Sequence, residues 1–312
     1  MGPVEGDAQF SVSSLGSIVY IPGGIIMCPR EGVWVDRKGK ARPIAESLPV
    51  AGNLQLSPDG KAVALGLGSA AKVDVYTFDL ERGIATKVSG SGDDYQALWT
   101  HDSRKLVYIS GRLGGQTLFS RNADGTGPEE PLTTNEGTKR PTSTLGDGTI
   151  AFSWRTTGPW GVWTLSPQSK PAKPTPLLTN SWNQVDAVFS PDGKWLAYSS
   201  DESGKMEVYV QSYPEGTSKL RVSGEGGSVP RWSRDGRELF YTTQSKLMAV
   251  QSVNTERFQP GKPGMLFEAQ NYVLYDVSLD GKEFLMMRLD ESTAVTRFNW
   301  LPVSRAVQLS QR

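Results

Sequence analysis

Short apolar runs of β-prone residues, separated by turn residues, follow one another along the chain. Between residues 187 and 222 there are four such runs, at Ala187–Ser190, Trp195–Ser199, Glu207–Gln211 and Lys219–Val222. Runs of this length, bounded by Gly, Pro, Asp and Ser, predict short antiparallel strands. No stretch shows a helical period of useful length. The pattern therefore predicts an all-β chain built from four-stranded units.

A turn signal of the type Ser-Pro-Asp-Gly recurs between the first and second runs of these units. Clear copies end at Gly60, Gly193, Gly236 and Gly281, and weaker copies end at Gly16, Ser103 and Gly148. The steps between these ends are 44, 43, 45, 45, 43 and 45 residues. A period near 44 with β-type flanks is typical of a β-propeller. Seven copies favour seven blades, with six as the alternative.

The turn residues have a local explanation. Ser and Asp side chains can bond the backbone of the turn, Pro fixes φ at the second position, and Gly accepts the positive φ that closes the turn. We therefore interpret the repeated Asp residues as turn formers rather than catalytic groups.

The repeat runs through the whole chain, so we predict a single domain, residues 1–312, made of seven units. The last unit lacks a fourth strand, for which the candidates are Pro3–Glu5 and Ala306–Leu309. Closing the ring matters because an open strand edge invites aggregation. The expected blades lie near 10–44, 54–88, 97–132, 141–178, 187–222, 230–267 and 275–302.

Composition narrows the class of partner. Lys plus Arg and Asp plus Glu both number 33, so the net charge is zero and no basic nucleic-acid footprint is expected. No apolar run reaches the ~18 residues of a membrane span. The only cysteine, Cys28, allows no internal disulfide and no multi-cysteine metal site. The polar start of the chain has no signal-peptide pattern, so it does not reveal the compartment.

Two stretches, residues 189–210 and 226–241, together with Phe298–Trp300, resemble TolB-like β-propeller repeats, a WD-like repeat class. The resemblance is closest to the propeller regions that follow kinase domains in bacterial serine/threonine-kinase-like proteins. It implies a binding or scaffold module of a larger bacterial protein and favours an extracytoplasmic location. It does not imply an activity.

Catalytic signals are weak. The only histidine, His101, falls in a turn and is expected on a surface hairpin away from the channel. The kinase motifs and the Gly-x-Ser-x-Gly elbow are both missing. We therefore predict no catalytic residues, no metal ligands and no cofactor, although a channel cation such as Ca²⁺ stays open. The alternative is a propeller enzyme, a metal- or carboxylate-dependent hydrolase or lyase acting at the channel mouth.

The antiparallel order of strands defines two faces. The turns between strands one and two of each blade lie on one face, the turn face. The loops between strands two and three, and the connections between blades, lie on the other, the loop face. The loop face carries longer, more varied segments, so we expect a protein, peptide or glycan to bind there. We expect the chain to be a monomer. Arg140, Asp186 and Arg231 begin the first strands of three consecutive blades and should lie near one another. The full set of ligand-binding candidates is Asp94, Tyr95, Arg140, Trp182, Asp186, Arg231 and Tyr275.

Overall fold

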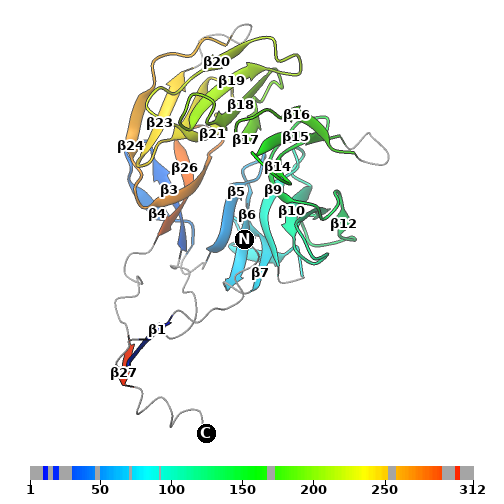
Figure 1. Ribbon diagram of the computed structural model, residues 1–312, viewed down its shortest axis with the longest axis vertical. Coiled ribbons are helices and arrows are strands. Elements are labelled where there is room, and N and C mark those ends of the chain that lie inside the picture. Colours follow the sequence, from blue (N-terminus) through cyan, green and yellow to red (C-terminus); the bar gives the residue numbers. More distant parts are fainter. Residues whose placement is uncertain are drawn as a thin grey trace.

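The computed structural model describes residues 10–12, 17–20, 30–45, 50–69, 72–90, 93–166, 173–251, 258–289 and 299–302. Most of these residues form six four-stranded antiparallel sheets. The first strand of each sheet contacts the first strands of its neighbours, so the sheets are arranged as the blades of a propeller (Figure 1).

Five blades are continuous in sequence. Blade 1 comprises β5 (Val50–Leu56), β6 (Ala62–Ser69), β7 (Lys72–Asp79) and β8 (Ile84–Lys87). Blade 2 comprises β9 (Asp94–Trp99), β10 (Lys105–Ser110), β11 (Thr117–Asn122) and β12 (Glu130–Pro131). Blade 3 comprises β13 (Thr138–Thr144), β14 (Ile150–Arg155), β15 (Gly161–Leu165) and β16 (Thr175–Leu178). Blade 4 comprises β17 (Gln184–Phe189), β18 (Trp195–Ser200), β19 (Glu207–Ser212) and β20 (Lys219–Arg221). Blade 5 comprises β21 (Ser228–Trp232), β22 (Glu238–Thr242), β23 (Lys246–Gln251) and β24 (Gly264–Glu268).

Blade 6 joins the two ends of the ring. Its inner strands are β25 (Tyr272–Val277) and β26 (Glu283–Leu289), and its outer strands are β3 (Arg30–Asp36) and β4 (Ala41–Pro43). Strand β26 pairs with β3 over seven residues, from Glu283 opposite Asp36 to Leu289 opposite Arg30. Two strands from each end of the chain therefore complete one sheet.

The predicted count of seven blades is wrong, because the structure has six. The C-terminal half of the expected first blade, 10–44, supplies β3 and β4 to blade 6, so the period counted one sheet twice. The end of the last expected unit, 275–302, does not join blade 6. Instead, β27 (Asn299–Pro302) pairs with β2 (Ser17–Tyr20), which also pairs with β1 (Phe10–Val12), and this small sheet lies apart from the blades (Figure 1). Both predicted closing segments, 3–5 and 306–309, lie outside the described residues.

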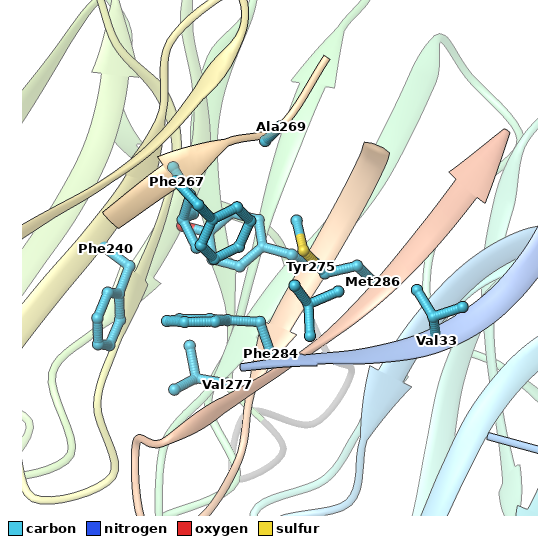
Figure 2. Close-up of a cluster of buried hydrophobic side chains, with 10 residues drawn as sticks. Val33, Phe240, Phe267, Ala269, Tyr275, Val277, Phe284 and Met286 are labelled. Carbon is cyan, nitrogen blue, oxygen red and sulfur yellow. The ribbon is translucent and has the colours of Figure 1, made fainter. Parts of the chain in front are cut away.

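An apolar cluster between blades 5 and 6 stabilises the closed ring. Figure 2 shows Phe284 and Met286 of β26, Val33 of β3, and Phe240 and Phe267 of blade 5 gathered in it. The rings of Phe240 and Phe284 meet edge to face, with centroids 5.0 Å apart. Burying such side chains contributes about 1.5–3 kcal/mol each, so blade 6 is held by packing as well as by strand pairing.

Hydrogen bonds also join the first strands around the ring. Every junction between neighbouring blades has at least one. Trp99 Nε1 donates to Gln55 O (3.1 Å), Thr144 Oγ1 to Trp99 O (3.0 Å), Phe189 N to Ser143 Oγ (3.1 Å), Trp232 Nε1 to Val188 O (3.3 Å), Tyr275 OH to Val229 O (2.8 Å) and Leu56 N to Asp276 Oδ2 (2.9 Å).

Candidate functional site

A cavity with a volume of about 530 Å³ lies at the turn-face end of the central channel. The turn between strands one and two of every blade contributes its second residue to the wall. These six residues are Pro58, His101, Gly146, Pro191, Arg234 and Leu279. One sequence position, repeated around the ring, thus forms the mouth of what we call the turn-face cavity.

A second repeated position forms the deeper wall. It lies two residues before the Ser position of the turn, on the first strand of each blade. These six residues are Gln55, Leu98, Ser143, Val188, Arg231 and Asp276. The cavity therefore mixes apolar walls with a few polar groups, as ligand sites generally do, and its size falls within their usual range of about 300–1,000 Å³.

The turns themselves are stabilised by their own side chains, as predicted. Ser190 Oγ donates to Asp192 Oδ1 (2.6 Å), and the same oxygen accepts the backbone N–H of Lys194 (3.1 Å). Gly193 closes the turn with a φ of 70°. Equivalent Ser–Asp or Thr–Asp bonds occur at residues 57–59, 100–102, 233–235 and 278–280. The Asp residues are thus committed to the turns, which hold the cavity mouth in place.

The charges of the cavity are unevenly distributed. Arg231 and Arg234 both belong to blade 5, and neither forms an ion pair with any described residue. In contrast, both carboxylate oxygens of the buried Asp276 accept backbone bonds, Oδ2 from Leu56 N (2.9 Å) and Oδ1 from Val277 N (2.8 Å). The other carboxylates of the lining, Asp59 and Asp102, belong to the turns of blades 1 and 2. The blade 5 side of the cavity is therefore cationic, which suits an acidic ligand group.

His101 lies where the sequence analysis did not expect it. It does occupy a hairpin turn, but its side chain lines the turn-face cavity. The expectation of a position away from the channel was wrong because the tips of the first hairpins converge on the channel axis. The close-packed ring brings His101 within 4 Å of where a Cβ on Gly146 would lie.

Three of the predicted ligand residues share an electrostatic environment around the channel. Burial raises the pKa of Asp186, and the charges of Arg231 and Arg140 oppose that rise. Asp186 lies at a bulge of β17 with a φ of 55°. The guanidinium of Arg140 lies over the Trp160 ring, 4.7 Å from its centroid. The charges of these three side chains therefore influence one another, and their role in binding stays a prediction.

The other four predicted residues lie in separate places. Asp94 is fully buried and pairs with Arg112 (3.2 Å). Tyr95 is half-buried, and its OH accepts a bond from Gln116 Nε2 (2.7 Å). Tyr275 is buried and donates to Val229 O, which joins blades 5 and 6. Trp182 is 48% exposed on the connection between blades 3 and 4. Their contacts indicate structural roles for Asp94 and Tyr275, and their roles in binding stay predictions.

Sequence reasoning missed most of the turn-face cavity. Arg234, Gly146, Leu279 and His101 all stand at the second turn position, beside the Asp that was interpreted as a turn former. Their shared register was visible in the repeat and could have identified them as one ring. The sequence analysis favoured the loop face because its segments are longer, and that preference stays a prediction; the turn-face cavity lies at the other end of the channel.

Across the described ranges, no group of three or more His, Cys, Asp or Glu side chains is placed to hold a metal ion.

Comparisons with known proteins agree with this architecture. A scan against models of protein families finds no match. The Tol-Pal system protein TolB of Wolinella succinogenes is 26% identical over 166 residues, which is 51% of this chain and 39% of that protein. The structure of putative TolB from Agrobacterium tumefaciens superposes with a TM-score of 0.65 at 18% identity, covering 84% of this chain and 98% of the other. The chain is a TolB-like β-propeller.

The same fold also occurs in enzymes. Oligogalacturonate lyase from Vibrio parahaemolyticus superposes with a TM-score of 0.55 at 13% identity, covering 92% of this chain and 93% of the other. Similarity of this TolB-like propeller to solved structures therefore establishes its fold and not its activity. The TolB relative is matched over well under half of its length. Within the described residues, no helix is long and apolar enough to cross a membrane.

Proposed function

We propose that this TolB-like propeller is a non-catalytic binding module that holds a segment of a partner protein in the turn-face cavity. The observation that carries the proposal is the convergence of two repeated positions from all six blades on one cavity of about 530 Å³. Its apolar wall, with Pro58, Pro191 and Leu279 at the mouth, suits an apolar side chain, and Arg231 and Arg234 suit a neighbouring carboxylate.

The similarity to TolB proteins supports a binding role, and the fold's occurrence in enzymes keeps the hydrolase or lyase alternative as the second candidate. Following the resemblance, we further propose that the propeller belongs to a larger bacterial protein and works outside the cytoplasm. We retain the loop face as a predicted second contact surface. Arg140 and Asp186 lie at that end of the channel.

Selection of peptides from a random display library against the purified chain tests the proposal. We expect enriched peptides that combine an acidic residue with an apolar one. Gly146→Trp should abolish their binding, because the new side chain stands at the cavity mouth. Its backbone lies outside the left-handed region and its nearest neighbour is a His101 atom 3.7 Å from the added Cβ, so the fold should tolerate the change.

The matched control is Gly224→Trp, at an exposed connection between blades 4 and 5 on the loop face, with no atom within 4 Å of the added Cβ. This variant should bind like the wild type. Equal loss in both variants, equal retention in both, or a library without enriched peptides would each contradict the proposal. The double variant Arg231→Ala/Arg234→Ala should bind the acidic peptides about tenfold or more weakly, since charged hydrogen bonds contribute about 1.5–3 kcal/mol.

A further inference from the structure

A second cavity lies on the opposite face of the propeller, at blade 3. It has a volume of about 370 Å³ and is built from connections on the loop face. We call it the tryptophan cavity, because three indole rings line it. Besides these rings, Glu136 and Asn180 are part of its lining.

Two of the indoles form a fixed corner. Trp154 near the end of β14 and Trp163 of β15 have ring centroids 4.8 Å apart, with planes inclined at 62°. Trp154 Nε1 donates to Glu136 O (3.0 Å), which fixes the orientation of its ring. Both rings are only half-buried, so they present flat apolar surface to the cavity.

The third indole is held by its backbone. Trp160 N donates to Asn183 Oδ1 (3.1 Å), and Trp160 O accepts the N–H of Gln184 (2.9 Å). Asn183 is itself bonded to Asp201 through its N–H (2.8 Å) and its side-chain amide (2.6 Å). The connection that carries Trp160 is thus tied to blade 4, which pre-organises the cavity wall.

A buried lysine supports the remaining wall. Lys139 is fully buried, and its Nζ donates to the carbonyl oxygens of Gln116, Thr134 and Glu136. These bonds pin the 134–136 segment and so place Glu136 at the cavity. Burial lowers the pKa of Lys139 to about 8. Because Nζ is occupied by carbonyl groups, we assign Lys139 a positioning role and no direct contact with a ligand.

The polar groups around the indoles are mainly neutral. The hydroxyls of Thr156, Thr157 and Thr179 and the amide of Asn180 surround the rings, with Glu136 as the one carboxylate. The guanidinium groups of Arg140 and Arg155 both lie over the Trp160 ring, each 4.7 Å from its centroid. The Lys139 ammonium beside Trp154 is bonded to carbonyl groups. The corner of Trp154 and Trp163 therefore offers an apolar platform with donors and acceptors at its edge, and the nearby cations are already engaged.

From this arrangement we propose that the tryptophan cavity binds a neutral oligosaccharide. A pyranose has an apolar face of C–H groups, which can stack on an indole, and a rim of hydroxyls, which need several hydrogen-bonding partners at once. The corner of Trp154 and Trp163 supplies the platform, and Asn180 and Glu136 supply partners for the hydroxyls. This site is separate from the turn-face cavity and does not depend on it.

The test probes the purified full chain with an array of neutral gluco-, manno-, galacto- and N-acetylated oligosaccharides, together with uronate-containing ones. We expect binding to neutral members. Titration of a neutral member that binds should change the intrinsic tryptophan fluorescence, because the ligand covers indole rings.

Asn180→Ala and Glu136→Ala should each weaken that binding about tenfold or more. Glu136→Ala should melt like the wild type because its side chain is exposed. Asn180→Ala should melt slightly lower, because Asn180 Oδ1 accepts the N–H of Trp182 (2.9 Å). Gly146→Trp, at the turn-face cavity, should leave saccharide binding unchanged, so the two proposals can fail separately. The inference is overturned if no neutral saccharide binds, if only uronates bind, if peptides displace the saccharide from this cavity, or if Asn180→Ala and Glu136→Ala bind normally.

Discussion

Arg37 forms a two-point ion pair with Glu238, a residue 201 positions later in the chain. Nη1 donates to Glu238 Oε2 (2.9 Å) and Nη2 to Oε1 (2.8 Å), while Nη1 also donates to Gly281 O (3.0 Å). Arg37 follows β3, Glu238 begins β22 of blade 5, and Gly281 closes the first turn of blade 6. The pair therefore ties the N-terminal strands to the rest of the ring.

This pair should contribute measurably to stability. We expect Arg37→Ala and Glu238→Ala each to lower the free energy of unfolding by about 1 kcal/mol, between the values for exposed ion pairs and for charged hydrogen bonds, because both groups are partly exposed. A double-mutant cycle by urea denaturation checks the coupling, and additive effects would show that the pair contributes nothing as a pair.

Ring closure by β3 and β4 gives a second prediction. A chain that begins at residue 46 lacks both outer strands of blade 6, which exposes the edge of β26 and the apolar cluster of Figure 2. We expect this chain to aggregate or to lose its cooperative unfolding transition, measured by circular dichroism and light scattering.

The matched control removes residues 1–20 instead. Strands β1 and β2 pair only with one another and with β27 among the described strands, so this shorter chain should keep the wild-type unfolding midpoint of its ring. Cooperative unfolding of the chain that begins at residue 46 would mean that blade 6 does not need its outer strands.

The repeat predicted the blades well but not their number. Each turn is specified locally, because Ser, Asp and Gly act within a few residues of one another, as at Ser190–Gly193. The number of blades depends on which strands close the ring, and Glu283 finds its partner Asp36 across almost the whole chain. No local signal in the residues around Asp36 distinguishes the outer strands of a first blade from those of a last one.

The same argument applies to the candidate site. The ring from Pro58 to Leu279 consists of ordinary turn residues, and only the radial arrangement brings them to one cavity. Arg140, Asp186 and Arg231 were predicted to lie close together because they stand at equivalent places on consecutive first strands. The hydrogen bond from Trp160 to Asn183 could not be predicted from the sequence, since it depends on the course of two loops.

The turn aspartates Asp192 and Asp235 should affect stability without affecting binding. Asp192→Ala and Asp235→Ala each remove a bond to a Ser hydroxyl and one to a backbone N–H, and neither side chain lines the turn-face cavity. We expect each to cost about 0.5–1 kcal/mol, since these exposed bonds compete with water, and to leave binding of the selected peptides unchanged. Denaturation midpoints and peptide affinities measure the two effects. Loss of binding without loss of stability would reverse this assignment.

The Asp235 effect should depend on pH. The hydrogen bond from Ser233 and the N–H of Arg237 lower the pKa of Asp235 below its usual 3.8. A lowered folded-state pKa gives stability that is present above the unfolded pKa and is lost as pH falls through the folded value. The difference between wild type and Asp235→Ala should therefore be full at pH 7 and shrink below about pH 4. A difference that stays constant down to pH 2 would contradict the role of the ionised carboxylate.

The contribution of Asp186 to stability should change with pH in the opposite direction. Burial raises its pKa, with Arg231 and Arg140 opposing. A raised folded-state pKa of an acid favours the folded protein at low pH, and this advantage is lost as pH rises through the folded value. At pH 7 the ionised carboxylate is therefore a net cost, which Asp186→Asn removes. Asn also tolerates the positive φ of 55° at this bulge.

We accordingly expect Asp186→Asn to have a higher urea midpoint than the wild type at pH 7, with the difference disappearing near pH 4. Asp186→Ala is the matched control for the backbone, because it removes the same charge but lacks a side chain suited to positive φ, and it should be less stable than Asp186→Asn at every pH. A wild type more stable than Asp186→Asn at pH 7 would mean that attraction to Arg140 and Arg231 outweighs the cost of burial. The carboxylate would then be a stabilising link between blades 3, 4 and 5.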